Sequence, residues 1–393
     1  MIDFGMDREA FRSDFFERGP LLRRGCFDAS RFGWSLIDRA LDIQDPSRES
    51  LKVMHGGRLD PSNYVEEYSD VGLRRRRILK DRLYRLVDEG ATVVLNRIEL
   101  VSLPVRDICM EIGRFIGAQA TANAYASLGK EPATSVHWDT HDVFVVQLGG
   151  RKRWRLYEPT HPLPISSQES HDHKEEVPKE PILDEVLEAG DTLYVPRGWW
   201  HRVEPVEGSD TLHLAVGIHT PLILDYLVWA CASVLPNFLE MRRSLLGRPG
   251  ETIQVDEAIS ILASTMRDPK TLAAFYERSE QRERVITPFH FNHLVHKSFP
   301  IPEDTYIMLN TRYASRDSTV IRINGSVPNT SGVHQTIIGV LAGSIDFSII
   351  DLRSRLPGIS VDEIDTALRD LARADLIALS LPSEHYGVLE NAA

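Results

Sequence analysis

The 393-residue sequence has few cysteines and no excess of positive charge. Its three cysteines, Cys26, Cys109 and Cys231, are far apart and odd in number, which argues against a disulfide framework or a zinc knuckle and predicts buried thiols in a reducing compartment. The formal net charge of −12 argues against a polyanionic partner held by bulk electrostatics, because phosphate contacts need clustered lysine and arginine. The composition, 42% hydrophobic and 26% charged, is that of a globular protein with about two or three domains.

The sequence also lacks a long, clean apolar run. The longest one, 222–239, contains Asp225 and Pro236 and falls short of the roughly 20 apolar residues that a membrane span requires. This run is expected to form a buried or dimer-forming helix. The first residues, MIDFGMDREAFRSDFF, are mixed in charge and contain no apolar segment typical of a signal peptide. The sequence therefore predicts a soluble, cytoplasmic protein without a membrane partner.

The pattern of apolar residues changes along the chain. The first 60 residues are expected to be helical with loops, and amphipathic helices are predicted at about 78–88 and at 105–117. From 120 to 218 the sequence predicts short strands separated by turns, including a hairpin at Gly149-Gly150. The polar, proline-interrupted segment 160–182 is expected to be a long surface loop within this β domain. The strand spacing predicts an all-β barrel or sandwich.

The chain after Pro221 is predicted to be mainly helical as far as about residue 285. The last part reads as three short helices closed by a strand, with Ser360 and Glu363 forming a capping box at the start of the third helix. The predicted elements are helices 333–342, 346–356 and 361–374 and a strand at 376–381. Three short helices followed by a strand are typical of a winged helix.

One stretch offers metal ligands at a spacing that suits a strand. In Ser135–Asp142, SVHWDTHD, His137 and Asp139 are separated by one residue, so on an extended strand their side chains point the same way. One imidazole and one carboxylate are two of the three ligands that hold non-haem Fe(II) with open coordination positions. A His-x-Asp triplet alone is weak evidence, so the surrounding sequence has to support it.

A third ligand is expected from GDTLYVPRGWWH, residues 190–201. A glycine turn, a strand, a rigid Pro-x-Gly corner and a terminal histidine fit a closing strand pair of a barrel, which would bring His201 opposite the first metal strand. His141 and His213 are alternative third ligands. His141 keeps the strand period of His137 and Asp139, although the chain could already turn at Thr140.

Lys152 is the next candidate functional residue. In GGRKRWRLY the arginines occupy one face of the predicted strand, and Lys152 shares the other face with Trp154 and Leu156. An unpaired ammonium on an inward face costs several kcal/mol, so it requires a fixed anion. That anion is either the carboxylate of a bound cosubstrate or an internal Asp or Glu, unless the faces of the strand are reversed.

Together, HWDTHDVFVVQLGGRKRWRLYEP and GDTLYVPRGWWH resemble the JmjC-domain hydroxylases of the cupin superfamily, and most nearly their ribosomal oxygenase branch. Over nearly the whole chain, the resemblance also extends to the order and type of the predicted elements. It implies an α+β chain in which a double-stranded β-helix barrel is followed by a helical dimerisation region and a C-terminal winged-helix domain. The implied domains are 1–221, with a helical lead-in to the catalytic barrel, 222–286 for dimerisation, and 287–393.

The resemblance also implies roles for individual residues. His137, Asp139 and His201 match the Fe(II) ligands, and Lys152 matches the basic residue that pairs with the far carboxylate of the cosubstrate 2-oxoglutarate. Three further residues match positions around the same cosubstrate: Asn123, Tyr125 and His213. From the residues alone, Asn123 could instead satisfy backbone groups, Tyr125 could be a core aromatic, and His213 could be a hydrogen-bonded core histidine.

The implied function is hydroxylation of a protein or peptide side chain by a homodimer, with Arg or His of a ribosomal protein as the expected target. Three alternatives stay open: the same chemistry on a ribosomally made peptide or a small metabolite, demethylation of N-methyl-lysine, and a non-catalytic protein that uses the winged helix as a binding module. Direct DNA binding is not expected, because from Val333 onward nine acidic residues stand against four arginines and no lysine.

Overall fold

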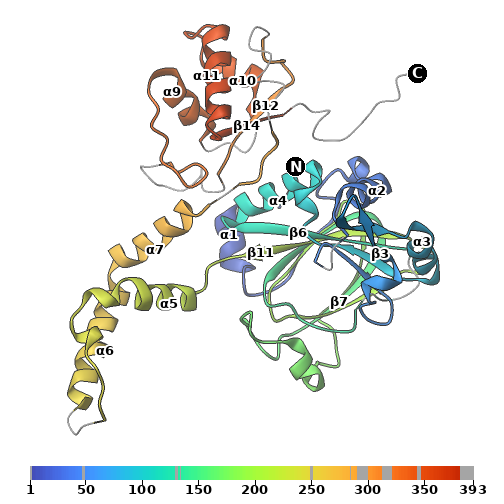
Figure 1. The fold of residues 1–393 in the computed structure, drawn as a ribbon, viewed down its shortest axis with the longest axis horizontal. Helices are drawn as coiled ribbons and strands as arrows, with labels where there is room; N and C mark the ends of the chain where they lie inside the picture. The colour runs from blue at the N-terminus through green and yellow to red at the C-terminus, as the bar shows by residue number, and fades with distance from the viewer. Residues whose placement is uncertain are drawn as a thin grey trace. The chain divides into compact units, whose positions relative to one another are not determined.

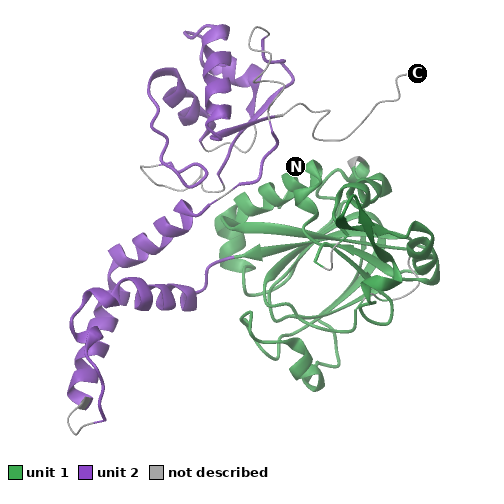
Figure 2. Cartoon of the chain, viewed as in Figure 1, with its two compact units in different colours: residues 1–219, 383–393 green, residues 220–382 purple. Residues whose placement is uncertain are grey.

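The structure, a computed structural model, describes residues 2–46, 49–128, 132, 134–247, 251–283, 285–289, 300–311, 321–342 and 347–380. The chain forms two compact units, and the division between their structured parts falls between His219 and Thr220 (Figure 2). Parts of the predicted segment 287–393 lie outside the described residues.

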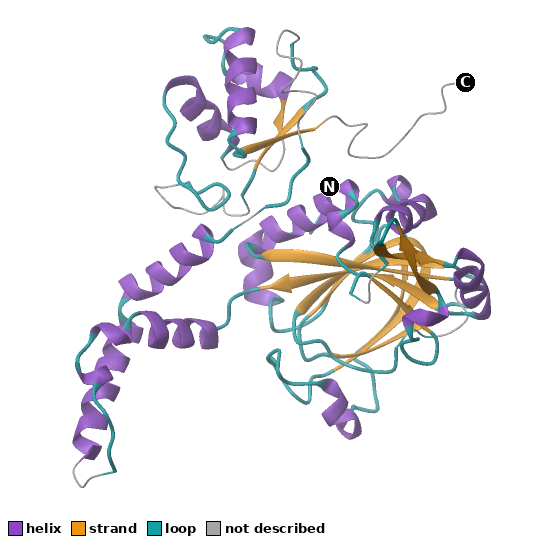
Figure 3. Ribbon diagram, in the orientation of Figure 1, coloured by secondary structure: helices purple, strands orange, loops and turns teal. Residues whose placement is uncertain are grey.

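The first unit is built on a nine-stranded antiparallel sheet that curls into a barrel (Figures 1 and 3). Seven strands follow the order β1-β9-β7-β11-β6-β5-β2, and β8 and β10 both pair with the far half of β7. The strands are β1 (Leu21–Arg23), β2 (Leu51–Met54), β5 (Thr92–Leu95), β6 (Gln119–Ser127), β7 (Asp142–Tyr157), β8 (Leu183–Glu188), β9 (Thr192–Val195), β10 (Trp200–Pro205) and β11 (Thr211–His219).

Strand β7 is common to both sides of the barrel. Its first half pairs with β11 and β9, and its second half pairs with β8 and β10. The predicted hairpin at Gly149-Gly150 is therefore wrong: the strand continues through the two glycines. Gly150 has φ +63°, and a Cβ there would lie 1.7 Å from the carbonyl oxygen of Asp210. Only glycine fits this close approach, and the two glycines mark a change of partner strands, not a chain reversal.

The alternation of side chains along the strands separates two cores. On β6, Ala122, Ala124 and Ala126 face the helices and belong to the largest buried cluster. The helices of this unit are α1 (Arg8–Asp14), α2 (Trp34–Ile43), α3 (Lys80–Glu89) and α4 (Leu103–Ile116). Ile108, Ile112 and other apolar residues of α4 pack into that cluster, as the predicted helix at 105–117 requires. The opposite faces of the strands line the barrel interior, where a smaller cluster includes Val145, Trp154 and Leu156.

Several elements of this unit differ from expectation. The first 60 residues supply the strands β1 and β2 to the sheet, in addition to helices. A separate two-stranded sheet, β3 (Val65–Asp70) and β4 (Leu73–Ile78), follows them. Cys26 and Cys109 are buried as expected, but Cys231 is exposed, which corrects the prediction that all three thiols are buried.

The second unit begins with three helices and ends in a small α/β arrangement. The helices are α5 (Ile223–Ser233), α6 (Glu251–Arg267) and α7 (Pro269–Gln281). The remainder comprises β12 (Tyr306–Leu309), α9 (Gly332–Leu341), β13 (Phe347–Ser348), α10 (Ile349–Arg355), α11 (Val361–Arg373) and β14 (Ile377–Ser380), with the strands in the order β13-β12-β14. The capping box of Ser360 and Glu363 at the start of α11 is present. Among the described helices, none is long and apolar enough to cross a bilayer.

Candidate metal centre

His137, Asp139 and His201 come together at one end of the barrel interior. One ligand atom from each lies within 4.8 Å of the other two. The Nε2 atoms of the two histidines are 3.2 Å apart, and Asp139 Oδ2 lies 3.7 Å from Nε2 of His201. The backbones of His137 and His201 are joined by two hydrogen bonds of 2.8 and 3.1 Å. Strand β10 therefore holds His201 directly opposite His137.

The tautomer of each histidine follows from its other nitrogen. Nδ1 of His137 lies 2.8 Å from the carbonyl oxygen of Ser135, and Nδ1 of His201 lies 3.1 Å from that of Trp199. Because a carbonyl oxygen only accepts, each Nδ1 carries the proton and donates it. In the neutral rings both Nε2 atoms then present lone pairs to the same point, as metal-ligating histidines do.

The electrostatics of the three residues suit a cation. Burial, and then the neighbouring His137, lower the pKa of His201 to about 4, so that its ring is neutral near pH 7. Burial by itself would raise the pKa of Asp139, but the nearby His201, His137 and His141 bring it below its usual value, so the carboxylate is ionised. Two bare imidazole nitrogens and one carboxylate are the donor set of the facial triad that suits Fe(II).

The corner before His201 explains its placement. Gly198 has φ +85°, and a Cβ there would lie 2.7 Å from the carbonyl oxygen of His161. The Gly198 amide donates to the carbonyl of Asp139 at 3.0 Å, which ties the corner to the first ligand strand. Trp200 beside it is fully buried and donates from Nε1 to Thr160 Oγ1 at 2.9 Å.

Lys152 lies in the same cavity as His137, Asp139 and His201. It is only 2% exposed, and burial lowers its pKa to about 8. No ion pair joins it to any carboxylate in the described part of the chain, and Asp139 is the one acidic residue among those that line the cavity. A buried ammonium without a partner is costly, so the site is arranged to receive an anion.

Tyr125 and His213 also line this cavity, together with Thr92. The rings of Tyr125 and His213 stack at 4.9 Å across paired strands β6 and β11. Burial, and then Lys152, lower the pKa of His213 to about 3, whereas burial, and then Asp139, raise the pKa of Tyr125 to about 12, so both rings are neutral near pH 7. His213 Nδ1 and Thr92 Oγ1 are buried and have no hydrogen-bond partner among the described residues. These unpaired polar atoms and Lys152 fit the carboxylates of 2-oxoglutarate.

Two candidates from the sequence lie elsewhere. Asn123 shares the inward face of β6 with Tyr125 but is not among the residues that line the cavity; its Oδ1 accepts from the Arg97 amide at 3.2 Å. Its role at the cosubstrate remains a prediction. His141, an alternative ligand, stacks on His219 at 5.6 Å and stands outside the three-residue cluster, as His213 does.

Several residues of the site have no role that the sequence predicted. Trp154 packs between His201 and His213, with ring centroids 6.0 and 5.8 Å away. In the sequence, the alternation of side chains along the strand places Trp154 on the same face as Lys152, and this pattern indicates that Trp154 lies near the site. In the long loop after β7, His161 stacks on Trp138 at 5.7 Å. The loop therefore packs against Trp138, the residue between His137 and Asp139.

Part of the chain is similar to a known domain family. Residues 98–226 match the JmjC domain family. A curated relative, the bifunctional lysine-specific demethylase and histidyl-hydroxylase NO66 of Drosophila erecta, is 31% identical over 169 residues, which are 43% of this chain and 26% of the relative. Ribosomal oxygenase 1 of Danio rerio is 26% identical over 247 residues, 61% of this chain and 44% of the relative. The chain thus spans less than half the length of these relatives.

Solved structures of similar fold cover nearly the whole chain. YcfD, a ribosomal oxygenase from Escherichia coli solved with cobalt and succinic acid, covers 97% of this chain and 100% of its own, at a TM-score of 0.57 and 15% identity. The same protein solved with cobalt and 2-oxoglutarate gives a TM-score of 0.55 at 16% identity. At this identity the likeness establishes the fold alone. Residues 98–226 are thus similar to the JmjC domain family, and the fold is similar to that of a ribosomal oxygenase.

Proposed function

We propose that the chain is an Fe(II)- and 2-oxoglutarate-dependent oxygenase that hydroxylates a side chain of a protein or peptide. The observation that carries this proposal is one cavity that contains both the His137–Asp139–His201 cluster and the unpaired ammonium of Lys152. A metal site alone suits many reactions. A metal site beside a buried, unneutralised cation suits a cosubstrate that binds the metal at one end and carries a carboxylate at the other.

Each residue has a definite task in this proposal. His137, Asp139 and His201 hold the iron and leave its remaining coordination positions open. Lys152 binds the far carboxylate of 2-oxoglutarate, and His213 and Thr92 offer further hydrogen bonds. Bound together, iron and 2-oxoglutarate would activate O2, so that one oxygen atom is taken up as 2-oxoglutarate is oxidised to succinate and CO2 and the other is inserted into the C–H bond of the substrate. Val143, Val145, Trp154 and other apolar residues of the lining exclude water from the cosubstrate.

We infer that the substrate is a ribosomal protein, hydroxylated on Arg or His. The activities for which the relatives are named support this choice, and so does the net charge of −12, since ribosomal proteins are basic. The test is mass spectrometry of ribosomal proteins from cells that make the active chain and from cells that make its His137→Ala variant. One oxygen atom added only in the first sample supports the proposal, and identical masses would favour a peptide or small-metabolite substrate.

We further propose that 222–286 is a dimerisation region and that 287–393 contains a winged helix that binds protein, with 1–221 as the catalytic domain of a cytoplasmic enzyme. Large apolar side chains on α5 and α6 stand exposed, including Ile223 (80%) and Ile253 (73%). Helices α9, α10 and α11 with β14 follow the winged-helix order.

Light scattering tests the dimer. Ile253→Glu combined with Ile259→Glu should halve the mass in solution, and an unchanged mass would exclude this face of α6 as the dimer contact.

A further inference from the structure

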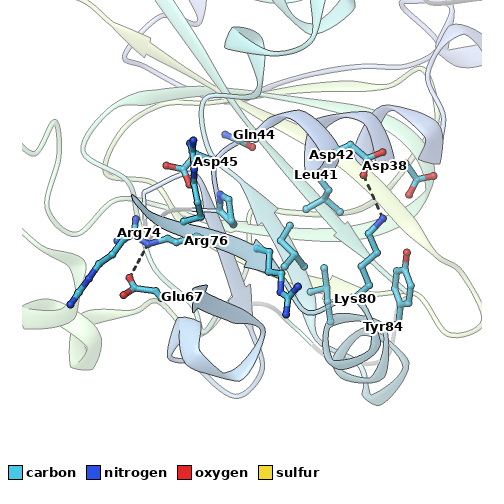
Figure 4. Close-up of a pocket in the computed structure, with 15 residues that line it drawn as sticks. Asp38, Leu41, Asp42, Gln44, Asp45, Glu67, Arg74, Arg76, Lys80 and Tyr84 are labelled. Carbon is cyan, nitrogen blue, oxygen red and sulfur yellow. Dashed lines mark hydrogen bonds and ion pairs between the residues drawn. The ribbon is translucent and has the colours of Figure 1, made fainter. Parts of the chain in front are cut away.

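A second cavity of about 930 Å³ lies outside the metal centre, between α2, the start of α3 and the β3–β4 sheet (Figure 4). Five consecutive residues of β4, Arg74 to Ile78, line it, whereas β3 contributes only Glu67. Successive side chains of a strand point to opposite faces, so consecutive residues line one cavity only when it runs along the edge of the strand. The cavity is therefore a groove along the outer edge of β4.

This edge has no partner strand in the described part of the chain. β4 pairs with β3 on one side, from Val65↔Ile78 to Asp70↔Leu73, and the sheet contains only these two strands. An edge strand presents unpaired N–H and C=O groups at every second residue. Such an edge accepts an extended peptide by strand addition, in which main-chain hydrogen bonds supply affinity and side chains supply specificity.

The arginines of β4 are not all neutralised by β3. Glu67 accepts from Arg76 Nε at 3.0 Å, and Glu66 accepts from Arg77 Nε at 2.7 Å. Arg74 and Arg75 stand opposite Ser69 and Tyr68, and neither has an ion partner among the described residues. The strand thus leaves two adjacent guanidinium groups, one on each face of the sheet, that match carboxylates well.

The other side of the groove limits what can occupy it. Asp38, Asp42 and Asp45 line this wall, and Lys80 Nζ lies 3.6 Å from Asp42 Oδ1 (Figure 4). A nucleic acid brings one charge per nucleotide and would pass all three carboxylates, which repel phosphate. An acidic peptide can place its charges only beside the arginines. Leu41, Ile78, Leu83 and Pro46 supply apolar surface along the groove.

We propose that this groove binds an extended acidic peptide segment of a partner protein, which adds as a third strand to the edge of β4. Two successive acidic side chains of the segment pair with Arg74 and Arg75, one on each face of the enlarged sheet. Apolar side chains of the segment contact Leu41 and Ile78. The groove shares no lining residue with the metal centre, so it serves recognition of a partner and not the chemistry.

The first test measures fluorescence anisotropy of a labelled short peptide, rich in Thr and Val with Glu-Glu at its centre, against the full chain. Arg74→Glu combined with Arg75→Glu should weaken binding by at least about tenfold. The control variant combines Arg18→Glu with Arg82→Glu, two exposed arginines outside the groove, and so changes the net charge by the same amount. Its affinity for the peptide should stay within about twofold of that of the unsubstituted chain. Equal loss in both variants, or no binding by the unsubstituted chain, would overturn the proposal. Tighter binding of a single-stranded RNA of similar length would also overturn it.

The second test separates strand addition from simple charge attraction. Two versions of the peptide carry N-methyl groups on alternate residues, in the two possible registers, with charge and side chains unchanged. Methylation on the edge that faces β4 should abolish binding, because it removes the main-chain donors, whereas the other register should bind nearly as well as the parent peptide. Equal binding of both versions would exclude strand addition. Neither test uses iron or 2-oxoglutarate, so its outcome is independent of the proposed oxygenase activity.

Discussion

The Nε2 atoms of His137 and His201 lie 3.2 Å apart, while each Nδ1 donates to a carbonyl oxygen. Two ligands about 2.1 Å from one metal ion and at right angles to each other lie about 3 Å apart, so the spacing fits a shared cation. His201→Ala should therefore weaken Mn(II) binding at least about 100-fold, since ligand loss costs more than loss of an outer hydrogen bond. Calorimetric titration with Mn(II) measures the change.

The matched control for this substitution is His334→Ala. His334 belongs to the second unit, where its Nε2 lies 3.5 Å from Oδ2 of Asp370, and its loss should leave the Mn(II) affinity unchanged. Circular dichroism verifies that both variants are folded. Undiminished Mn(II) binding by the His201 variant would mean that the three-residue cluster is not the metal site.

Lys152→Met removes a buried ammonium that has no described anionic partner and keeps most of the side-chain volume. Without 2-oxoglutarate the variant should be more stable than the parent by about 1–3 kcal/mol, because burying an unpaired charge opposes folding. With Mn(II) present throughout, the stabilisation of the parent by added 2-oxoglutarate should disappear in the variant. Chemical denaturation with and without the cosubstrate checks both points. A destabilised variant would indicate that Lys152 has an internal anionic partner.

The pH dependence of 2-oxoglutarate binding should also report on Lys152. Burial lowers its pKa to about 8, and only the ammonium form attracts a carboxylate. Affinity should be constant from about pH 6.5 to about pH 7.5 and should fall as the pH rises through about 8, approaching tenfold per pH unit. His213, with a pKa of about 3, is neutral throughout this range and does not contribute. In Lys152→Arg the guanidinium stays charged, so the fall above about pH 8 should be absent; its persistence would assign the titration to another group.

The passage of β7 between the two sides of the barrel depends on Gly150. In Gly150→Ala the new Cβ would lie 1.7 Å from the carbonyl oxygen of Asp210 at a φ of +63°, and the loss of stability should be at least about 3 kcal/mol. Gly208 has φ +69°, but a Cβ added there would meet nothing within 4 Å, so Gly208→Ala should cost only about 1 kcal/mol. The denaturation midpoints of the two variants compare these costs, and similar midpoints would show that β7 can bend elsewhere.

Local signals predicted much of the fold. Helices α3 and α4 and the capping box at Ser360 all follow from short-range periodicity and capping chemistry. The turn at Gly149-Gly150 was misread because two glycines serve equally well for a reversal and for a close approach of another backbone. The strands β1 and β2 were missed because they are short and depend on partners far along the chain: β1 pairs with β9.

The candidate metal ligands could be named from the sequence because they lie in two short motifs with strong backbone requirements. The structure brings these three residues within 4.8 Å of one another, and their role as metal ligands stays a prediction. The other residues that line the cavity could not be predicted as fully. Asn123 and Tyr125 share one face of β6, yet only Tyr125 lines the cavity, and which residue of a face reaches a cavity depends on the depth of the barrel, not on strand periodicity.

The most direct test is calorimetric titration of 2-oxoglutarate into the chain with and without Mn(II). Cosubstrate binding should require the metal and should be lost in both His201→Ala and Lys152→Met, because one end of the molecule binds the metal ion and the other binds the ammonium. Binding that is equally tight without metal, or that survives in the Lys152 variant, would contradict a shared iron and 2-oxoglutarate site.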